Sequence, residues 1–203
     1  MLYTDRMMRV LVVLAFLAGW ASATDLAAQR RAPPPSPGRR NGFWYGVGLA
    51  PAWARVSCSI CKGRRAFGAS AFAAMGGHSG PHLRIGAELG GWRHSDGGVT
   101  QSVASLGAVA LWFPSTRRAW YLKGGVAYVT HWIDDGTDLI TSTGLGPQFG
   151  IGIESPFGRR WTVAPFFNYA AGALLGGVKF NGADASDRAT VTFVQIGVSL
   201  THP

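Results

Sequence analysis

Large apolar and small residues alternate with a period of two along most of the chain beyond residue 42. Within residues 82–92, for example, Ile85 and Leu89 lie on one parity. Arg84 and Glu88 lie on the other parity, among glycines. This period is typical of β-strands whose two faces meet different surroundings. The segments that follow the pattern span residues 42–56, 66–77, 82–92, 99–113, 119–132, 139–154, 161–170 and 189–202.

The breaks between these segments alternate in length, which indicates how the strands are connected. Three are tight turns of about five residues, with the sequences GHSGPH, PSTRR and SPFGRR. The other four are residues 57–66, the stretches RHSDGG and IDDGTD, and residues 171–188. Consecutive antiparallel strands would place all the tight turns at one end of the sheet and the longer loops at the other.

The composition of the two faces indicates what each face contacts. One face carries large apolar side chains, whereas the other carries Gly, Ala, Ser and Thr with a few charges. The side chains of this second face are too small and too rarely charged to form a solvated exterior. We therefore expect the apolar face to contact lipid, where only a closed barrel satisfies every backbone group. The pattern predicts an all-β fold, an eight-stranded antiparallel up-and-down transmembrane barrel. A soluble ligand-binding barrel is the alternative.

Aromatic side chains cluster near the ends of the predicted strands. Outer-membrane barrels carry such residues in girdles at both membrane interfaces. The side chains expected in a girdle here are Trp44, Tyr45, Trp53, Trp92, Trp112, Trp120, Trp132 and Trp161.

The composition and the first 41 residues predict an exported protein. Apolar residues make up 47% of the chain, which excludes a disordered composition. Two arginines precede an apolar run at residues 10–20, which is too short for a transmembrane helix and is followed by small residues. We predict a signal peptide at residues 1–29, a basic Pro-rich periplasmic linker at 30–41 and the barrel at 42–203.

The net charge of +9 indicates anionic partners. Arginine greatly outnumbers lysine, which favours bidentate contact with phosphates or carboxylates. For an exported protein, we expect these to belong to anionic lipid or peptidoglycan, and we expect no contact with nucleic acid. The pairs Arg117–Arg118 and Arg159–Arg160, on the inner turns, are the residues placed for such contact.

The C-terminal sequence QIGVSLTHP carries a polar residue, a glycine and then alternating apolar positions. With this motif, residues 42–203 resemble the small eight-stranded outer-membrane barrel families typified by the OmpA barrel domain and OmpX. The resemblance implies residence in the bacterial outer membrane and an insertion signal recognised by the outer-membrane assembly machinery. The matching positions are Gln195, Gly197 and Leu200, whereas His202 stands where the family usually has an aromatic residue and Pro203 follows it.

An eight-stranded barrel is only wide enough inside for side chains. The inward parity holds two positive and two negative charges, which can cancel in a buried, mutually satisfied network. A gated proton or ion path is the alternative. The predicted network consists of Arg84, Glu88, Lys123, Gln148, Glu154, Asn168 and Gln195.

Cys58 and Cys61 form a Cys-x-x-Cys pair in the first predicted outward loop. A redox Cys-x-x-Cys motif normally begins a helix, and no helix is apparent here. Because the thiols of exported proteins are oxidised, a local disulfide is favoured. A metal site completed by His94 and His131, or free or intermolecular thiols, remain alternatives.

The same loop is basic, with Arg55, Lys62, Arg64 and Arg65, and we expect it to engage outer-leaflet phosphates or another acidic ligand. The competing possibilities are that it pairs with the acidic loop Asp134, Asp135 and Asp138, or that it is solvated.

The sequence favours a non-catalytic role without cofactor or metal, in envelope integrity or in surface interaction through the outer loops. A lipid-modifying barrel enzyme and a narrow pore are the alternatives. The nearest catalytic match is His94, Ser95 and Asp96, but neighbouring residues of a strand alternate faces and so do not assemble a relay.

Overall fold

The computed structural model describes residues 42–58, 65–115, 119–174, 176–186 and 189–202, and the ordered elements among them are strands. The predicted signal peptide and linker lie outside these ranges. Among the described residues, no helix is long and apolar enough to cross a membrane. The long strands are β1 (Phe43–Cys58), β2 (Ala66–His78), β3 (Leu83–Asp96), β4 (Val99–Trp112), β5 (Trp120–Asp134), β6 (Leu139–Ile153), β8 (Trp161–Gly172) and β11 (Ala189–His202).

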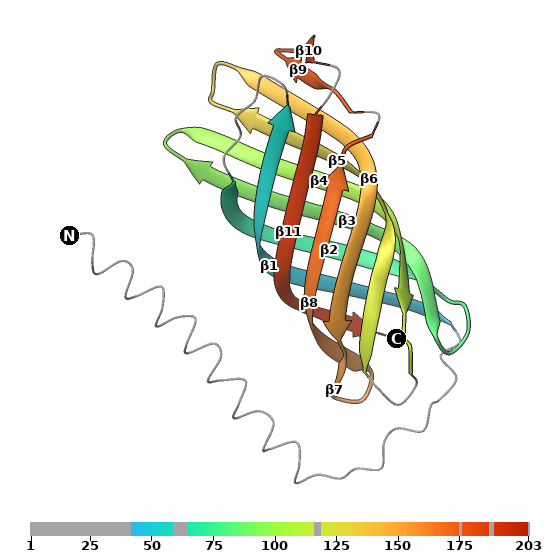
Figure 1. The fold of residues 1–203 in the computed structure, drawn as a ribbon. Helices are drawn as coiled ribbons and strands as arrows, with labels where there is room; N and C mark the ends of the chain where they lie inside the picture. Colours follow the sequence, from blue (N-terminus) through green and yellow to red (C-terminus); the bar gives the residue numbers. More distant parts are fainter. Residues whose placement is uncertain (1–41, 59–64, 116–118, 175, 187–188, 203) are drawn as a thin grey trace, which may run out of the picture. The chain divides into compact units, whose positions relative to one another are not determined.

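These eight strands form a closed barrel in which each strand pairs antiparallel with its neighbours (Figure 1). Strands β1 to β6 pair in chain order, β1 pairs with β11, and β11 pairs with β8. The ring closes where residues 148–152 of β6 pair with residues 166–170 of β8. The prediction of an eight-stranded antiparallel up-and-down barrel is therefore confirmed.

The stretch RHSDGG was expected to be a loop, and this expectation is wrong for its first four residues. Residues 93–96 continue β3 and pair with residues 99–102 of β4. The reason is the turn: Gly97 and Gly98 adopt positive φ values of 58° and 86°, so two residues suffice to reverse the chain. The barrel wall therefore extends further at the loop end than the alternation suggested.

The stretch 171–188, expected to be a loop, also contains strands. A short hairpin is formed by β9 (Val178–Phe180) and β10 (Ala183–Ser186), joined at Asn181 and Gly182 with φ values of 48° and 84°. Strand β9 pairs with residues 140–142 of β6 and so lengthens the sheet there. A further short strand, β7 (Ser155–Phe157), pairs with the start of β8 at the tight-turn end.

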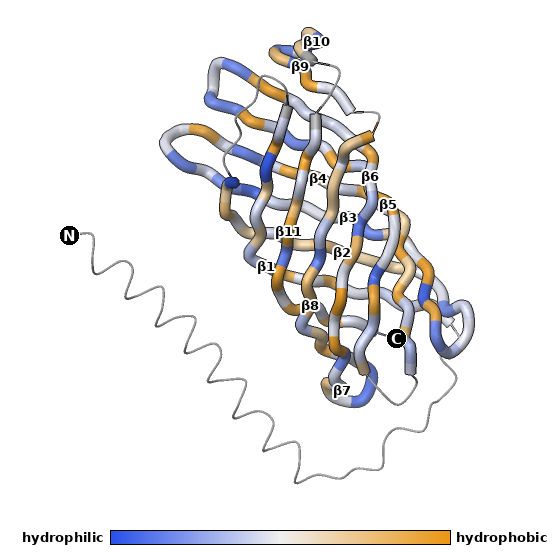
Figure 2. The backbone as a smooth tube through the Cα atoms, in the orientation of Figure 1, coloured by the Kyte–Doolittle hydropathy of each residue, from blue (hydrophilic) through white to orange (hydrophobic). Residues whose placement is uncertain are grey.

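The two faces of the wall differ as the alternation predicts. Hydropathy alternates along the strands in Figure 2. On the outside, Leu49, Leu106 and Phe149 expose 71%, 59% and 56% of their surface. The inside holds buried small, apolar and charged residues. The outer surface is thus the apolar one, the reverse of a water-soluble barrel.

Trp44 and Trp92 were expected in the aromatic girdle, but both are buried in the barrel interior. Their parity explains this, because Trp92 lies an even number of residues from inward-facing Arg84. The indole Nε1 of Trp44 donates to the carbonyl of Gly77 at 3.3 Å, and that of Trp92 donates to the carbonyl of Ala52 at 3.2 Å. Both buried donors are therefore satisfied.

Gly76 and Gly86 form a cross-strand pair that lets β2 and β3 approach closely, and Gly86 also makes room for the buried Trp44. A Cβ on Gly86 would lie 2.8 Å from Cζ2 of Trp44. A Cβ on Gly76 would collide with the Ile85 carbonyl oxygen and lie 2.5 Å from Cα of Gly86. Both neighbours of Gly76 are backbone atoms, which cannot swing aside as a side chain can.

We expect Gly76→Ala to lower the free energy of unfolding by about 1–3 kcal/mol, the usual cost of overpacking. Gly77→Ala is the matched control, because no heavy atom lies within 4 Å of a Cβ at this neighbouring position. Urea unfolding of both variants in lipid vesicles measures the difference. Equal stability of the two variants would contradict the close approach of β2 and β3.

Candidate functional sites in the barrel interior and on the outer wall

Arg84 and Glu154 form a buried ion pair at the tight-turn end of the interior. Two nitrogens of the guanidinium donate to the two carboxylate oxygens, Nη1 to Oε1 and Nη2 to Oε2, the latter at 3.2 Å. Nε donates to Nε2 of His78 at 3.1 Å, and the guanidinium lies 4.8 Å from the ring centroid of Phe113. Arg84 and Glu154 expose 1% and 6% of their surface, so each requires the other as its counter-charge.

Lys123 and Glu88 form a second interior ion pair. The Nζ of Lys123 donates to both carboxylate oxygens of Glu88 at 2.6 Å. The ammonium also lies 5.5 Å from the ring centroid of Phe72. With Arg84 and Glu154, this pairing brings the charge of the interior network to zero.

The amide side chains of the network bond to one another and to the wall. Gln148 donates to the carbonyls of Ala108 and Val126, at 3.3 and 3.4 Å. A separate chain runs along the inner face of neighbouring strands: Asn168 donates to Gln195 at 3.4 Å, and Gln195 donates to the Ser70 hydroxyl at 3.1 Å.

The Ser70 hydroxyl in turn donates to the carbonyl of Ala50 at 2.8 Å. The structure therefore places all seven residues of the predicted network inside the barrel, as two ion pairs and three amide side chains, two of which bond to each other. Ser70 was missed by the sequence analysis, although its inward parity on β2 could have identified it.

The loop half of the interior is closed by apolar side chains, and one cluster of buried residues fills it. The cluster consists of Ala52, Ala54, Val56, Ala66, Trp92, Val103, Ala127, Val129, Val191 and Phe193. Toward the tight-turn end of the interior, a cavity of about 30 Å³ lies beside Lys123 and Glu154. A cavity of that size holds one or two waters and is no channel.

His131 is buried in this half, beside Trp92, with ring centroids 6.3 Å apart. Neither of its ring nitrogens has a hydrogen-bond partner among the described residues, and the hydroxyl of Ser142, its cross-strand neighbour, has none there either. His94 also lies against Trp92, at 6.1 Å. Within the described ranges, no group of three or more His, Cys, Asp or Glu side chains is placed to hold a metal. The side chain of Cys58 and all of Cys61 lie outside the described residues, so the disulfide stays a prediction.

The stretch His94, Ser95 and Asp96 does not form a relay in the structure. The Ser95 hydroxyl lies 3.1 Å from the hydroxyl of Thr100, across the hairpin. The ring of His94 packs against Trp92, on the opposite face of the strand. The hydroxyl and the imidazole therefore point to different sides of the wall.

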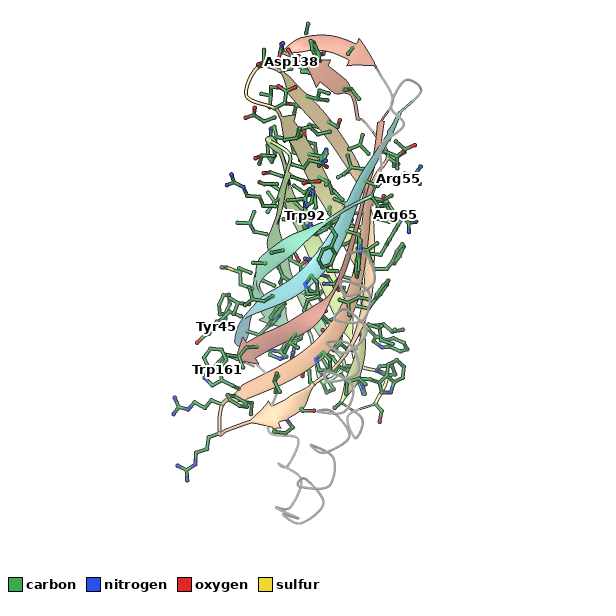
Figure 3. All side chains as sticks on the ribbon, turned by 90° about the vertical axis from the view of Figure 1, so that its left-hand side faces the viewer. Tyr45, Arg55, Arg65, Trp92, Asp138 and Trp161 are labelled. Atoms are coloured by element: carbon green, nitrogen blue, oxygen red, sulfur yellow. The ribbon has the colours of Figure 1, made fainter. Side chains whose placement is uncertain are left out.

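A hollow lies on the outer wall at the loop end and includes part of the predicted basic loop. Its cavity measures about 330 Å³, and its lining consists of Trp53, Ala54, Arg55, Arg65, Tyr169, Thr192 and Val194. Arg55 and Arg65 thus share one hollow, and both side chains point away from the barrel on the same side (Figure 3). Lys62 and Arg64 lie outside the described residues.

The carboxylates of the acidic loop have partners of their own near β9 and β10. Asp134 accepts from the backbone N–H of Gly136, at 2.8 Å. Asp135 accepts from Asp138 and Thr137, and these backbone N–H groups lower the pKa of the Asp135 carboxyl. Asp138 accepts from the Asn181 amide at 2.8 Å. Arg55 and Arg65 form no ion pair with a described residue, so among these residues nothing supports the alternative in which the acidic loop neutralises the basic loop.

The C-terminal strand ends in a cluster of three rings at the tight-turn end. The imidazole of His202 stacks on Tyr45, with centroids 5.1 Å apart and planes 7° apart. Trp161 packs edge-on against both rings, 5.3 Å from His202 and 5.7 Å from Tyr45 (Figure 3 labels Tyr45 and Trp161). His202 is therefore held in an aromatic cluster at the end of β11, and Pro203 lies outside the described residues.

The other positions of the predicted insertion signal have distinct places on β11. Gln195 lies inside, in the amide chain with Asn168. Gly197 lies against β1, where a Cβ would collide with the carbonyl oxygen of Leu49. Leu200 is partly exposed and pairs with Val47.

The closed ring of eight strands, with large apolar side chains exposed outside and two ion pairs inside, is the fold of the small outer-membrane barrel proteins. Among solved structures, the chain is similar to Neisserial surface protein A, with a TM-score of 0.57 and 18% identity over 79% of this chain and 98% of that one. OprG from Pseudomonas aeruginosa also matches, with a TM-score of 0.46 and 12% identity over 82% and 99% of the two chains. No family model and no curated protein matches the sequence.

Proposed function

We propose that the protein is an integral barrel of the bacterial outer membrane that catalyses no reaction and conducts no ions. The observation that carries the proposal is the contrast between the two faces of the wall. Large apolar side chains such as Leu49 and Leu106 are exposed on the outside, whereas the charges lie inside in pairs. In water this arrangement would leave a large apolar surface exposed, whereas in a bilayer the same surface is solvated by lipid.

The barrel then serves as an anchor for what it displays at its two ends. The loop end carries the basic residues near β1 and the acidic turn beside the β9–β10 hairpin, which support a role in envelope integrity or surface interaction. The exposed Arg159 and Arg160 at the tight-turn end would contact anionic lipid or peptidoglycan. The ion pairs and the apolar cluster favour a structural interior over a narrow pore, and the separated His94 and Ser95 disfavour a lipid-modifying enzyme.

Gel mobility of the unboiled and boiled protein, taken from a detergent-extracted outer-membrane fraction, tests this proposal. A closed barrel resists detergent, so the unboiled band should migrate faster than the boiled one. Planar bilayers containing the protein should show no single-channel steps. A protein that is recovered in the soluble periplasm without a mobility shift would contradict membrane insertion, and discrete conductance steps would contradict the closed interior.

We propose further that His202 completes the insertion signal as the terminal ring. His202→Ala removes the imidazole and with it the contacts to Tyr45 and Trp161, each worth about 0.5–1.5 kcal/mol. We expect a severalfold lower yield of the heat-modifiable barrel in the outer membrane, with His202→Phe at or above the original yield. Phe180→Ala, which removes an exposed ring at the opposite end, is the control. Equal yields for His202→Ala and Phe180→Ala would contradict the role of the ring.

A further inference from the structure

The hollow on the outer wall at the loop end, here called the basic groove, combines aromatic rings with two guanidinium groups. It spans three neighbouring strands of the wall, β1, β11 and β8, and reaches the start of β2. The register fixes how its residues are arranged. Trp53 pairs with Val194, and Val194 pairs with Tyr169, so the two rings flank one small side chain.

The same row of paired residues continues on both sides of the basic groove. Trp53 also pairs with Phe67 of β2, with ring centroids 5.3 Å apart, and Tyr169 also pairs with Phe149 of β6. Four aromatic residues therefore follow one register line across five strands. Amphipathic Trp and Tyr rings concentrate where the apolar band of a barrel meets the headgroups. Because barrel strands are tilted, the row runs obliquely through the membrane, and its Phe149 end lies nearer the tight turns. Trp53 and Phe67 lie near the loop ends of β1 and β2, and they place this end of the basic groove at the interface with the outer leaflet.

The two arginines lie immediately beyond this row, toward the loop end. Arg55 is two residues further along β1 than Trp53, on the same outward face, and pairs with Thr192. Arg65 directly precedes Ala66, which pairs with Ala54. Both arginine side chains are exposed, and neither is ion-paired with any residue that the structure describes. Two guanidinium groups are thus available at headgroup depth.

We propose that the basic groove binds the phosphorylated headgroup of an outer-leaflet glycolipid. Arg55 and Arg65 bind the phosphate through charge-assisted, bidentate hydrogen bonds. Trp53 and Tyr169 flank the headgroup sugar, and the acyl chains lie along the apolar wall below. The inference rests on the proposed function, since the basic groove faces this lipid only when the barrel spans the outer membrane. It deepens that function by giving the barrel a lipid partner of defined chemistry.

Native mass spectrometry of the detergent-solubilised protein, titrated with bis-phosphorylated lipid A, tests the proposal. The double variant Arg55→Gln/Arg65→Gln should bind the lipid about tenfold more weakly, a loss of about 1.4 kcal/mol. The control Arg93→Gln/Lys179→Gln removes the same charge from exposed basic residues outside the basic groove and should bind as the original protein does. Lipid A without its phosphates should bind the original protein about as weakly as bis-phosphorylated lipid A binds the double variant.

Gel mobility of the same samples separates the outcomes. Variants that keep the mobility shift but lose lipid binding support the basic groove. An equal loss in the control would overturn it in favour of general charge attraction, and tight binding of phosphate-free lipid A would overturn the role of phosphate. Complete displacement of the lipid by millimolar inorganic phosphate would overturn the lipid site in favour of a site for free phosphate.

If the original protein shows no mobility shift, the proposed function itself fails. If the double variant does not fold, the single variants Arg55→Gln and Arg65→Gln should each show about a threefold loss, and an unchanged affinity in both overturns the proposal.

Discussion

Replacing Arg84 with methionine is expected to lower the free energy of unfolding of the barrel by about 3–5 kcal/mol, because it removes one partner of a buried ion pair. Glu154 would be left in an interior position that exposes only 6% of the residue. Both of its carboxylate oxygens bond to the Arg84 guanidinium. The methionine also leaves Nε2 of His78 without the Arg84 donor.

The double variant Arg84→Met/Glu154→Gln separates the charge from the packing. It removes the unpaired carboxylate and should recover most of the lost stability, since a buried pair is often replaceable by neutral groups of similar volume. Arg159→Met, in the exposed turn before β8, is the control and should change stability by less than about 0.5 kcal/mol. Urea titrations in lipid vesicles give all three values. A neutral effect of Arg84→Met alone would mean that Glu154 is solvated or protonated in the barrel.

The parity of the alternation predicted which charges face inward, but it could not predict which of them pair. Arg84 and Glu88 lie on one face of β3 but about 13 Å apart along the strand, so their spacing does not pair them and leaves the partner of each open. In the structure, Arg84 pairs with Glu154, and Glu88 pairs with Lys123. These partners come from β5 and from the residue just after β6. Which of them meet across the interior depends on the stagger of the strands around the ring, which no local pattern contains.

The aromatic residues show the same limit in a different form. Trp44 and Trp92 lie near strand ends, and that position alone favoured the girdle. Their inward parity decided the outcome, and the missing Cβ of Gly86 leaves space that the indole of Trp44 fills. By contrast, Trp53 satisfied both criteria and lies in the outer row beside Phe67. Parity therefore predicted whether an aromatic side chain faces the interior or the outside better than distance from a strand end did.

The basic groove was only partly accessible to sequence reasoning. Arg55 and Arg65 flank the cysteine loop, so their clustering is visible in the chain. Tyr169 and Thr192 are more than a hundred residues away, and they join the hollow because β11 closes the ring against β1. Barrel closure thus converts a basic loop into one side of a groove.

Replacing Leu106 with arginine is the second large effect that we expect, and it tests which face of the barrel meets lipid. Leu106 lies in the middle of β4 and exposes 59% of its surface. Its cross-strand partners Leu89 and Tyr128 are exposed beside it. An arginine at the bilayer midplane on a barrel wall costs about 2–4 kcal/mol, because the guanidinium has no water and no counter-charge there. In a water-soluble barrel the same substitution would be neutral, since an exposed arginine is well hydrated.

Phe157→Arg provides the depth control for this experiment. Phe157 is as exposed as Leu106, at 61%, but it lies in the short strand β7 at the tight-turn end. Near the membrane interface the cost of arginine falls to about 0–1 kcal/mol. Urea unfolding in lipid vesicles should therefore separate the two variants by about 1–4 kcal/mol. Equal stabilities would mean that the exposed apolar residues of β4 do not lie in hydrocarbon, and the paired charges inside would then belong to a soluble barrel.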